Sequence, residues 1–139
     1  MSPYVQIIAP SIEIGTQWKE IKIDPSLKVV KKIQSVYIEV PEIPKWDFEM
    51  DTDTNNNYFI DPQGKQIKIE MQLISKDGQI FTMNSIHLGP GLGFSYIPKG
   101  KDLVNESRFP HDVIFDKMRV RSNQVFKGGQ VKWSCYSRK

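Results

Sequence analysis

Residues 67–73 alternate between apolar and polar side chains, and this pattern constrains the fold more than any other feature of the chain. The apolar residues Ile67, Ile69, Met71 and Leu73 are separated by Lys68, Glu70 and Gln72. Successive side chains of a β-strand point to opposite faces, so the pattern indicates a strand with one buried face and one hydrated face. Asp77-Gly78 follows closely and supplies the positive φ of a tight connection. We therefore predict a β-hairpin over residues 66–88.

Other short segments rich in Val, Ile, Tyr and Phe recur between Pro, Gly and Asn residues, which is typical of strands rather than helices. The candidate strands are residues 4–9, 18–23, 29–40, 66–74, 79–88, 93–97, 112–122 and 130–137. Helical periodicity is limited to residues 99–109, which have room for one or two turns. Hairpins without helices to cover a parallel sheet favour a sandwich or a barrel. We expect an all-β fold, a single-domain antiparallel β-sandwich that is jelly-roll-like, with little or no helix.

The length and composition fit an ordinary globular protein. A chain of 139 residues is long enough for one domain, so we expect a single β-sandwich domain over residues 1–139. Hydrophobic residues at 39%, charged residues at 25% and a mean hydropathy of -0.43 agree with this class. No apolar run approaches the ~20 residues that cross a bilayer, so we expect no membrane partner.

The N-terminal residues do not resemble a signal peptide. Gln6, Pro10 and Glu13 interrupt the apolar run that such a peptide needs, and no basic residue precedes it. We therefore expect a cytoplasmic protein, although a trimmed mature domain would share these features. Cys135 is the only cysteine, so no disulfide can form within the chain.

Gly128-Gly129 gives a second hairpin signal. A two-residue turn there would place Phe126 opposite Val131 and leave a cationic second face. The residues of that face would be Arg121, Lys127, Lys132, Tyr136 and Arg138. Such a face can follow a phosphate backbone, but charged outward faces are also usual on solvated sheets, and a pI of about 8.9 is not extreme. We therefore do not expect nucleic acid as a partner.

Residues 50–64 gather acidic and amide side chains in a short polar stretch. Asp51, Asp53 and Asn55 match the first three ligands of an EF-hand calcium loop. The match ends there, because Pro62 stands where the loop needs a bidentate glutamate. We expect a long irregular loop over residues 41–64 with a β-turn at residues 61–64, and neither a metal nor a cofactor.

Two features suggest catalysis or phosphate binding but lack the residues that complete such a site. Ser107, His111 and Asp112 lie close in sequence, yet no G-x-S-x-G elbow accompanies them. The glycines of residues 89–93 are not followed by the Lys-Ser/Thr pair of a phosphate-binding loop. We expect the protein not to be an enzyme.

Aromatic residues near the predicted strand ends suggest a ligand. An aromatic ring packs on the apolar face of a sugar, while carboxylate, amide and guanidinium groups bind its hydroxyls. The layout resembles that of carbohydrate-binding modules and other jelly-roll domains in overall fold. We predict a non-catalytic binding module with a loop-end glycan site formed by Trp46, Asp47, Asn57, Tyr58 and Arg108. The alternative is that the aromatic side chains of this region anchor the loop to the core.

Charge is distributed unevenly along the chain. Residues 39–61 hold seven acids and one base, whereas residues 117–139 hold seven bases and no acid. Opposite charge blocks suggest internal pairing or contact between copies. The alternative function is therefore a structural or interaction protein that forms a homo-oligomer through these acidic and basic segments.

Overall fold

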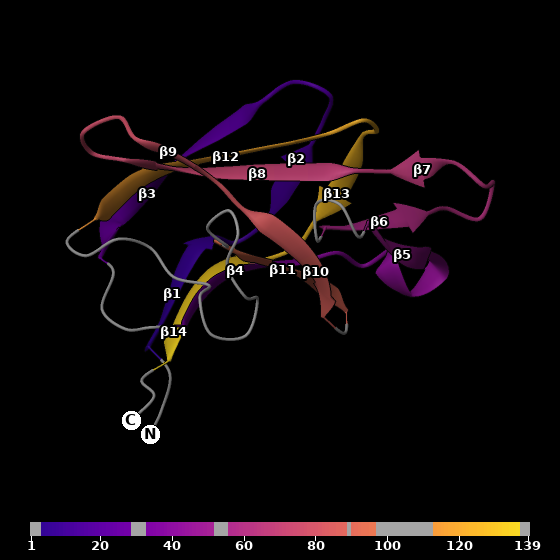
Figure 1. Ribbon diagram of the computed structural model, residues 1–139, viewed down its shortest axis with the longest axis horizontal. Helices are drawn as coiled ribbons and strands as arrows, with labels where there is room; N and C mark the ends of the chain where they lie inside the picture. The colour runs from indigo at the N-terminus through magenta and orange to yellow at the C-terminus, as the bar shows by residue number, and fades with distance from the viewer. Residues whose placement is uncertain (1–3, 29–32, 52–55, 89, 97–112, 137–139) are drawn as a thin grey trace.

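The computed structural model of the protein describes residues 4–28, 33–51, 56–88, 90–96 and 113–136 (Figure 1). Within these ranges the chain forms β-strands and one turn of 3-10 helix, η1 (Ile43–Lys45), and no α-helix. The strand pairs in these ranges are antiparallel. The predicted all-β, antiparallel, sandwich-like fold is confirmed. None of the described segments is a helix with the length and apolar character that crossing a membrane requires.

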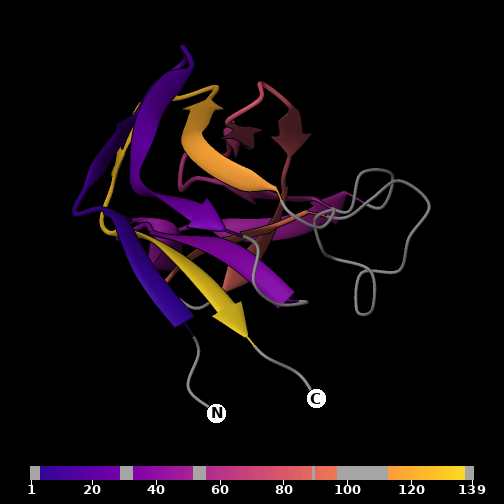
Figure 2. The ribbon, with the colours of Figure 1, turned by 90° about the vertical axis from the view of Figure 1, so that its left-hand side faces the viewer.

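Two large sheets and two small ones organise the strands (Figures 1 and 2). The five-stranded sheet has the order β1 (Tyr4–Ala9), β14 (Val131–Tyr136), β4 (Ile33–Glu39), β11 (Gly91–Ser95), β10 (Asn84–Leu88). The four-stranded sheet has the order β3 (Lys19–Lys28), β12 (Ile114–Ser122), β8 (Ile69–Ser75), β9 (Ile80–Thr82). The small sheets are β13 (Phe126–Gly128) with β2 (Ile12–Ile14), and β5 (Asp47–Asp51), β6 (Asn56–Ile60), β7 (Gln66–Ile67).

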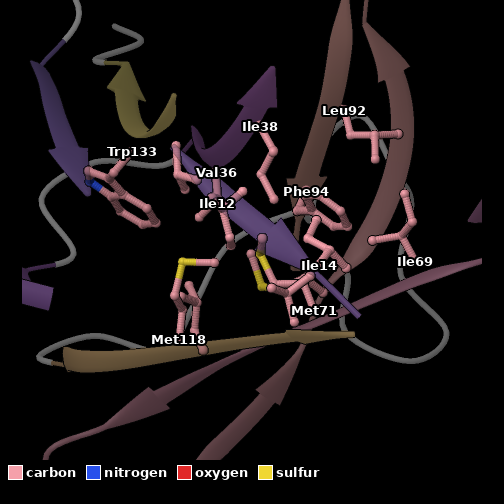
Figure 3. Close-up of a cluster of buried hydrophobic side chains, with 14 of the residues drawn as sticks. Ile12, Ile14, Val36, Ile38, Ile69, Met71, Leu92, Phe94, Met118 and Trp133 are labelled. Carbon is pink, nitrogen blue, oxygen red and sulfur yellow. The ribbon is translucent and has the colours of Figure 1, made fainter. Parts of the chain in front are cut away.

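The inner faces of the two large sheets form the core (Figure 3). Trp133 of the five-stranded sheet and Met71 and Met118 of the four-stranded sheet are fully buried. The Phe115 and Trp133 ring centroids lie 6.4 Å apart and connect the two sheets. A register shift between Phe115 and Lys117 explains why Phe115 and Met118 both face the core, although residues at this spacing normally face opposite sides.

The hairpin predicted over residues 66–88 is confirmed for β8 and β9, with Gly78 at a φ of 88° in the turn. The prediction is wrong beyond Thr82, because the chain then crosses to the other large sheet as β10. At the crossing the backbone N–H of Met83 donates to the Met71 carbonyl over 2.9 Å, and the Met83 side chain is buried. Met83, the residue between β9 and β10, is apolar and buried. The sequence therefore has no polar residue that would indicate where the chain leaves one sheet for the other.

The hairpin predicted at Gly128-Gly129 is wrong. β13 pairs with β2, whereas β14 pairs with β1 and β4. The two glycines instead allow close packing. A Cβ at Gly128 would lie 2.8 Å from Ile12 Cγ2 and 3.2 Å from the Glu39 carbonyl oxygen, and the Gly129 N–H donates to that carbonyl over 2.7 Å. The predicted cationic face does not form either, because β12 and β14, which carry basic residues of that face, belong to different sheets.

The long irregular loop predicted over residues 41–64 is also wrong, because η1, β5 and β6 lie in this stretch. The two strands lack an obvious apolar pattern since one face of their hairpin is polar, where Tyr58 Oη donates to Glu49 Oε2 over 2.7 Å. The β-turn predicted at residues 61–64 is confirmed. Gly64 has a φ of 83°, and its N–H donates to the Asp61 carbonyl over 2.9 Å.

Several predicted features lie outside the described residues. They are Asp53 and Asn55 of the calcium-loop match, the helical turns of residues 99–109, and Ser107, His111 and Asp112.

Gly91 belongs to the glycine-rich stretch that lacks the residues of a phosphate-binding loop, and it lies in β11 between β4 and β10. A side chain has no room there. An added Cβ would overlap the Ile38 carbonyl oxygen and lie 2.5 Å from Tyr37 Oη. Close packing therefore requires glycine at this position.

Gly91→Ala is expected to lower the free energy of unfolding by roughly 1–3 kcal/mol, the usual result of overpacking a filled site. Gly15→Ala is the matched control, because nothing lies within 4 Å of a Cβ added at Gly15. We expect that control to change stability by less than about 0.5 kcal/mol. Urea unfolding followed by tryptophan fluorescence measures both variants, and equal losses would show that neighbours do not constrain Gly91.

Candidate functional site

Trp46 follows η1 and contacts three parts of the chain. Its backbone N–H donates to the Ile43 carbonyl over 2.9 Å, next to the end of η1. Its indole packs against Phe59 of β6 at 5.8 Å and against Phe126 of β13 at 5.6 Å between ring centroids. Phe59 is buried, whereas Trp46 and Phe126 are half-buried. The indole is therefore held in place while part of it stays accessible.

A cavity of about 340 Å³ lies beside Trp46. Its lining comes from η1 and its flanks, from the turn before β7, and from the segment that leads into β13. The lining residues are Glu42, Lys45, Trp46, Asp61, Pro62, Gln63, Ile67, Gln124, Val125 and Phe126. Small-molecule sites in proteins have volumes of about 300–1,000 Å³, so this cavity has room for a small ligand.

Charged and amide groups are part of the cavity lining. Lys45 Nζ lies 3.3 Å from Glu42 Oε2, and both side chains are exposed. Gln124 Nε2 donates to the Gln66 carbonyl over 3.2 Å, which orients this amide. A ligand would therefore meet both hydrogen-bond donors and acceptors whose positions are partly fixed.

The turn at residues 61–64 forms another part of the wall. Asp61 Oδ1 accepts hydrogen bonds from the backbone N–H groups of Gln63 at 3.0 Å and Lys65 at 2.9 Å. Such an Asx arrangement fixes the turn, and Pro62 restricts φ within it. The exposed Gln63 side chain thus stands on a rigid support.

The apolar part of the lining includes Val125, which is 67% exposed. A single exposed valine is ordinary on a protein surface. Here it precedes Phe126 and borders the same cavity as Trp46 and the buried Ile67. The cavity therefore combines an apolar surface with polar groups around it. The polar groups of the described lining are the carboxylates of Glu42 and Asp61, the ammonium group of Lys45 and the amides of Gln63 and Gln124.

The structure places the predicted site residues on two faces of the β5–β6 hairpin. Glu49 pairs with Tyr58, and Asp47 shares their face because alternate residues of a strand point the same way. Trp46 packs on Phe59, which lies on the opposite face. Of the predicted residues, Trp46 therefore lines the cavity, and Asp47 and Tyr58 do not.

The remaining two predicted site residues are not placed at the cavity. Asn57 lies in β6, where only its backbone is described, and Arg108 lies outside the described residues. Their roles stay predictions. The alternative of anchoring is confirmed for Trp46 and Phe59, which pack with the core, whereas Phe48 is 51% exposed.

Sequence reasoning missed most of the cavity residues, notably Lys45, Gln63, Gln124 and Phe126. The β-turn at residues 61–64 is predictable from its sequence, and this turn carries Gln63 at the cavity. The approach of Phe126 to Trp46 depends on the pairing of β13 with β2, residues that are far apart in sequence. No local pattern predicts such a pairing.

Some described residues of the acidic and basic segments have partners within the chain. Arg121 Nε lies 3.2 Å from Glu70 Oε1, and Glu39 Oε1 accepts from the Gln130 N–H over 3.1 Å. These partners do not exclude contact between copies, so the predicted acidic–basic oligomer stays a prediction. Among the described residues, no group of three His, Cys, Asp or Glu side chains is placed to hold a metal ion.

No protein-family model matches this sequence, and comparisons with curated proteins and with solved structures find no match. The function is therefore inferred from the residues of the chain itself.

Trp46→Ala is expected to lower the free energy of unfolding by roughly 2–4 kcal/mol, because it removes the contacts with Phe59 and Phe126. Trp46→Phe retains an aromatic ring and should lower it by less than about 1.5 kcal/mol. Gln63→Ala is the control at the cavity rim, with a change within about 0.5 kcal/mol. Denaturant titration measures all three. A Trp46→Ala variant as stable as the wild type would show that the indole does not hold the hairpin.

Proposed function

We propose that the protein is a non-catalytic binding module that takes a carbohydrate in the cavity beside Trp46. The supporting observation is the combination of an indole, a second aromatic ring and several hydrogen-bonding side chains around one cavity of about 340 Å³. Sugars present C–H groups on one face and hydroxyls around the ring. An apolar surface bordered by polar groups complements both parts.

The charges around the cavity favour a neutral sugar over an acidic one. Glu42 and Asp61 contribute two carboxylates, and Lys45 contributes one ammonium group that already pairs with Glu42. An anionic ligand would meet a net negative rim, whereas hydroxyls can donate to the carboxylates and accept from the amides. We therefore propose a neutral oligosaccharide as the ligand class.

The test uses a panel of soluble oligosaccharides, namely the hexamers of the cello, xylo, manno, malto and chito series. Binding is followed by NMR on isotope-labelled protein. We expect one series to shift the Trp46 indole N–H and the signals of Gln63, Gln124 and Val125, which line the cavity. The oligosaccharide should remain intact on prolonged incubation, because the proposed module is not catalytic.

Gln63→Ala is expected to weaken that binding about 2- to 10-fold, as the loss of one hydrogen bond does. Phe48→Ala is the matched control, since Phe48 is exposed in the neighbouring hairpin but does not line the cavity. It should leave the affinity unchanged. Shifts confined to Asp47 and Tyr58 would instead locate the ligand on the other hairpin face, and no shifts with any hexamer would reject the carbohydrate proposal.

A further inference from the structure

The outer face of the four-stranded sheet has a regular arrangement of side chains. Alternate residues of a strand point to the same face, and the buried Met118 and Val120 mark the inner face of β12. Lys117, Arg119 and Arg121 therefore point outward. Because β12 lies between β3 and β8, the register places one residue of each neighbouring strand beside a given cation (Figure 1).

Arg121 has its charge balanced within the sheet. Its Nε and Nη2 atoms each lie 3.2 Å from a carboxylate oxygen of Glu70, the residue opposite it in β8. Its guanidinium carbon lies 4.3 Å from the ring centroid of Trp18, the residue that precedes β3. The pairing with Glu70 leaves this part of the face without excess charge.

Arg119 is fixed in orientation but has no ion pair among the described residues. Its Nε donates to Gln72 Oε1 over 2.6 Å, and its guanidinium carbon lies 4.6 Å from the Trp18 ring centroid. Glu20 is its register partner on β3, yet these two side chains form no ion pair. Neutral groups alone therefore hold this guanidinium, and its two Nη groups remain available as donors.

Lys22 and Lys117 place two like charges directly opposite each other. They are register partners on β3 and β12, both are exposed, and neither has an ion pair within the described ranges. Like charges in this position repel each other and destabilise the strand pair. Arg119 adds a third cation, two residues from Lys117 on the same face. An anion bound among the three would replace this repulsion with attraction.

An apolar surface continues the row of the two lysines across the sheet. Ile74 of β8 lies opposite Lys117, and Ile80 of β9 lies opposite Ile74. Ile74 is half-buried and Ile80 is 53% exposed. The row from Lys22 to Ile80 covers three strand spacings, about 14 Å. One half of it is cationic and the other half is apolar.

We infer that this face binds a phosphate monoester carried by an apolar group. The phosphate oxygens accept hydrogen bonds from Lys22, Lys117 and the Nη groups of Arg119, and the apolar group covers Ile74 and Ile80. The inference does not depend on the proposed carbohydrate site, because none of these residues lines the cavity.

The charge of the site suits a phosphate group. In the two rows that contain Lys22 and Arg119, three cations stand with one carboxylate, that of Glu20, which gives a net charge of +2. Asp24 follows in β3, where the pairing with β12 is interrupted. A phosphate monoester carries nearly two negative charges at neutral pH, whereas a carboxylate carries one. The dianion therefore matches the site more closely.

The first experiment is an NMR titration of the protein with phenyl phosphate, inorganic phosphate and phenol at constant ionic strength and pH 7.5. We expect both phosphates to shift the signals of Lys22 and Arg119, and phenyl phosphate to shift those of Ile80 as well. Phenyl phosphate should bind roughly 5-fold more tightly than inorganic phosphate, because its ring removes a few tens of Å² of apolar surface from water. Phenol should cause no saturable shift.

Two variants separate the charged half of the site from the apolar half. Lys117→Gln should weaken the binding of both phosphates about 5- to 10-fold, because a charge-assisted hydrogen bond is lost. Ile80→Thr should weaken the binding of phenyl phosphate and leave that of inorganic phosphate unchanged. Lys127→Gln is the matched control, since Lys127 is an exposed lysine of β13, outside the four-stranded sheet. It should leave both affinities unchanged.

Thermal unfolding distinguishes a site from general screening of charge. Phosphate should raise the Tm of the wild type more than sodium chloride does at the same ionic strength, because a ligand of the folded state stabilises it. Lys117→Gln should have a Tm at least as high as that of the wild type without phosphate, since it relieves the repulsion from Lys22. It should gain less from phosphate.

The carrier of the phosphate has two chemical sources, an aromatic side chain such as that of phosphorylated tyrosine and an aliphatic chain. Phenyl phosphate and hexyl phosphate separate these sources, and tighter binding of either one than of inorganic phosphate supports the site. Three results would overturn the inference. They are the absence of saturable shifts on the four-stranded sheet, equal Tm gains in phosphate and chloride, and an equal loss of affinity in Lys117→Gln and Lys127→Gln.

Discussion

The packing of Phe115 against Trp133 connects the inner faces of the two large sheets. Phe81 meets Phe115 edge to face at 5.5 Å, and Tyr96 meets Phe81 in the same way at 5.3 Å. The aromatic contacts thus continue from β14 through β12 to β9, the edge strand of the four-stranded sheet. Edge-to-face contacts specify orientation as well as burial. This aromatic series therefore fixes which face of these strands turns inward, and the opposite faces remain for contact with solvent or partners.

The cavity forms where smaller elements attach to this core. The β5–β6 hairpin is anchored by the buried Phe59, and β13 is held by its pairing with β2, whose Ile12 and Ile14 are core residues. Trp46 packs on side chains from both attachments. The cavity lies between the residues that flank this hairpin and the segment that leads into β13, which are distant in sequence. The cavity is thus a consequence of two separate elements meeting at one indole.

The sequence predicted the elements whose signals are local. The alternation around Met71 and the positive φ needed at Gly78 are properties of a few neighbouring residues, and β8, β9 and their turn follow from them. The pairing of β13 with β2 depends on distant residues, and a glycine pair that resembles a hairpin turn concealed it. Trp46 is predicted because aromatic residues at strand ends often bind ligands, but Gln124 and Phe126, which line the same cavity, belong to the segment that this long-range pairing holds in place.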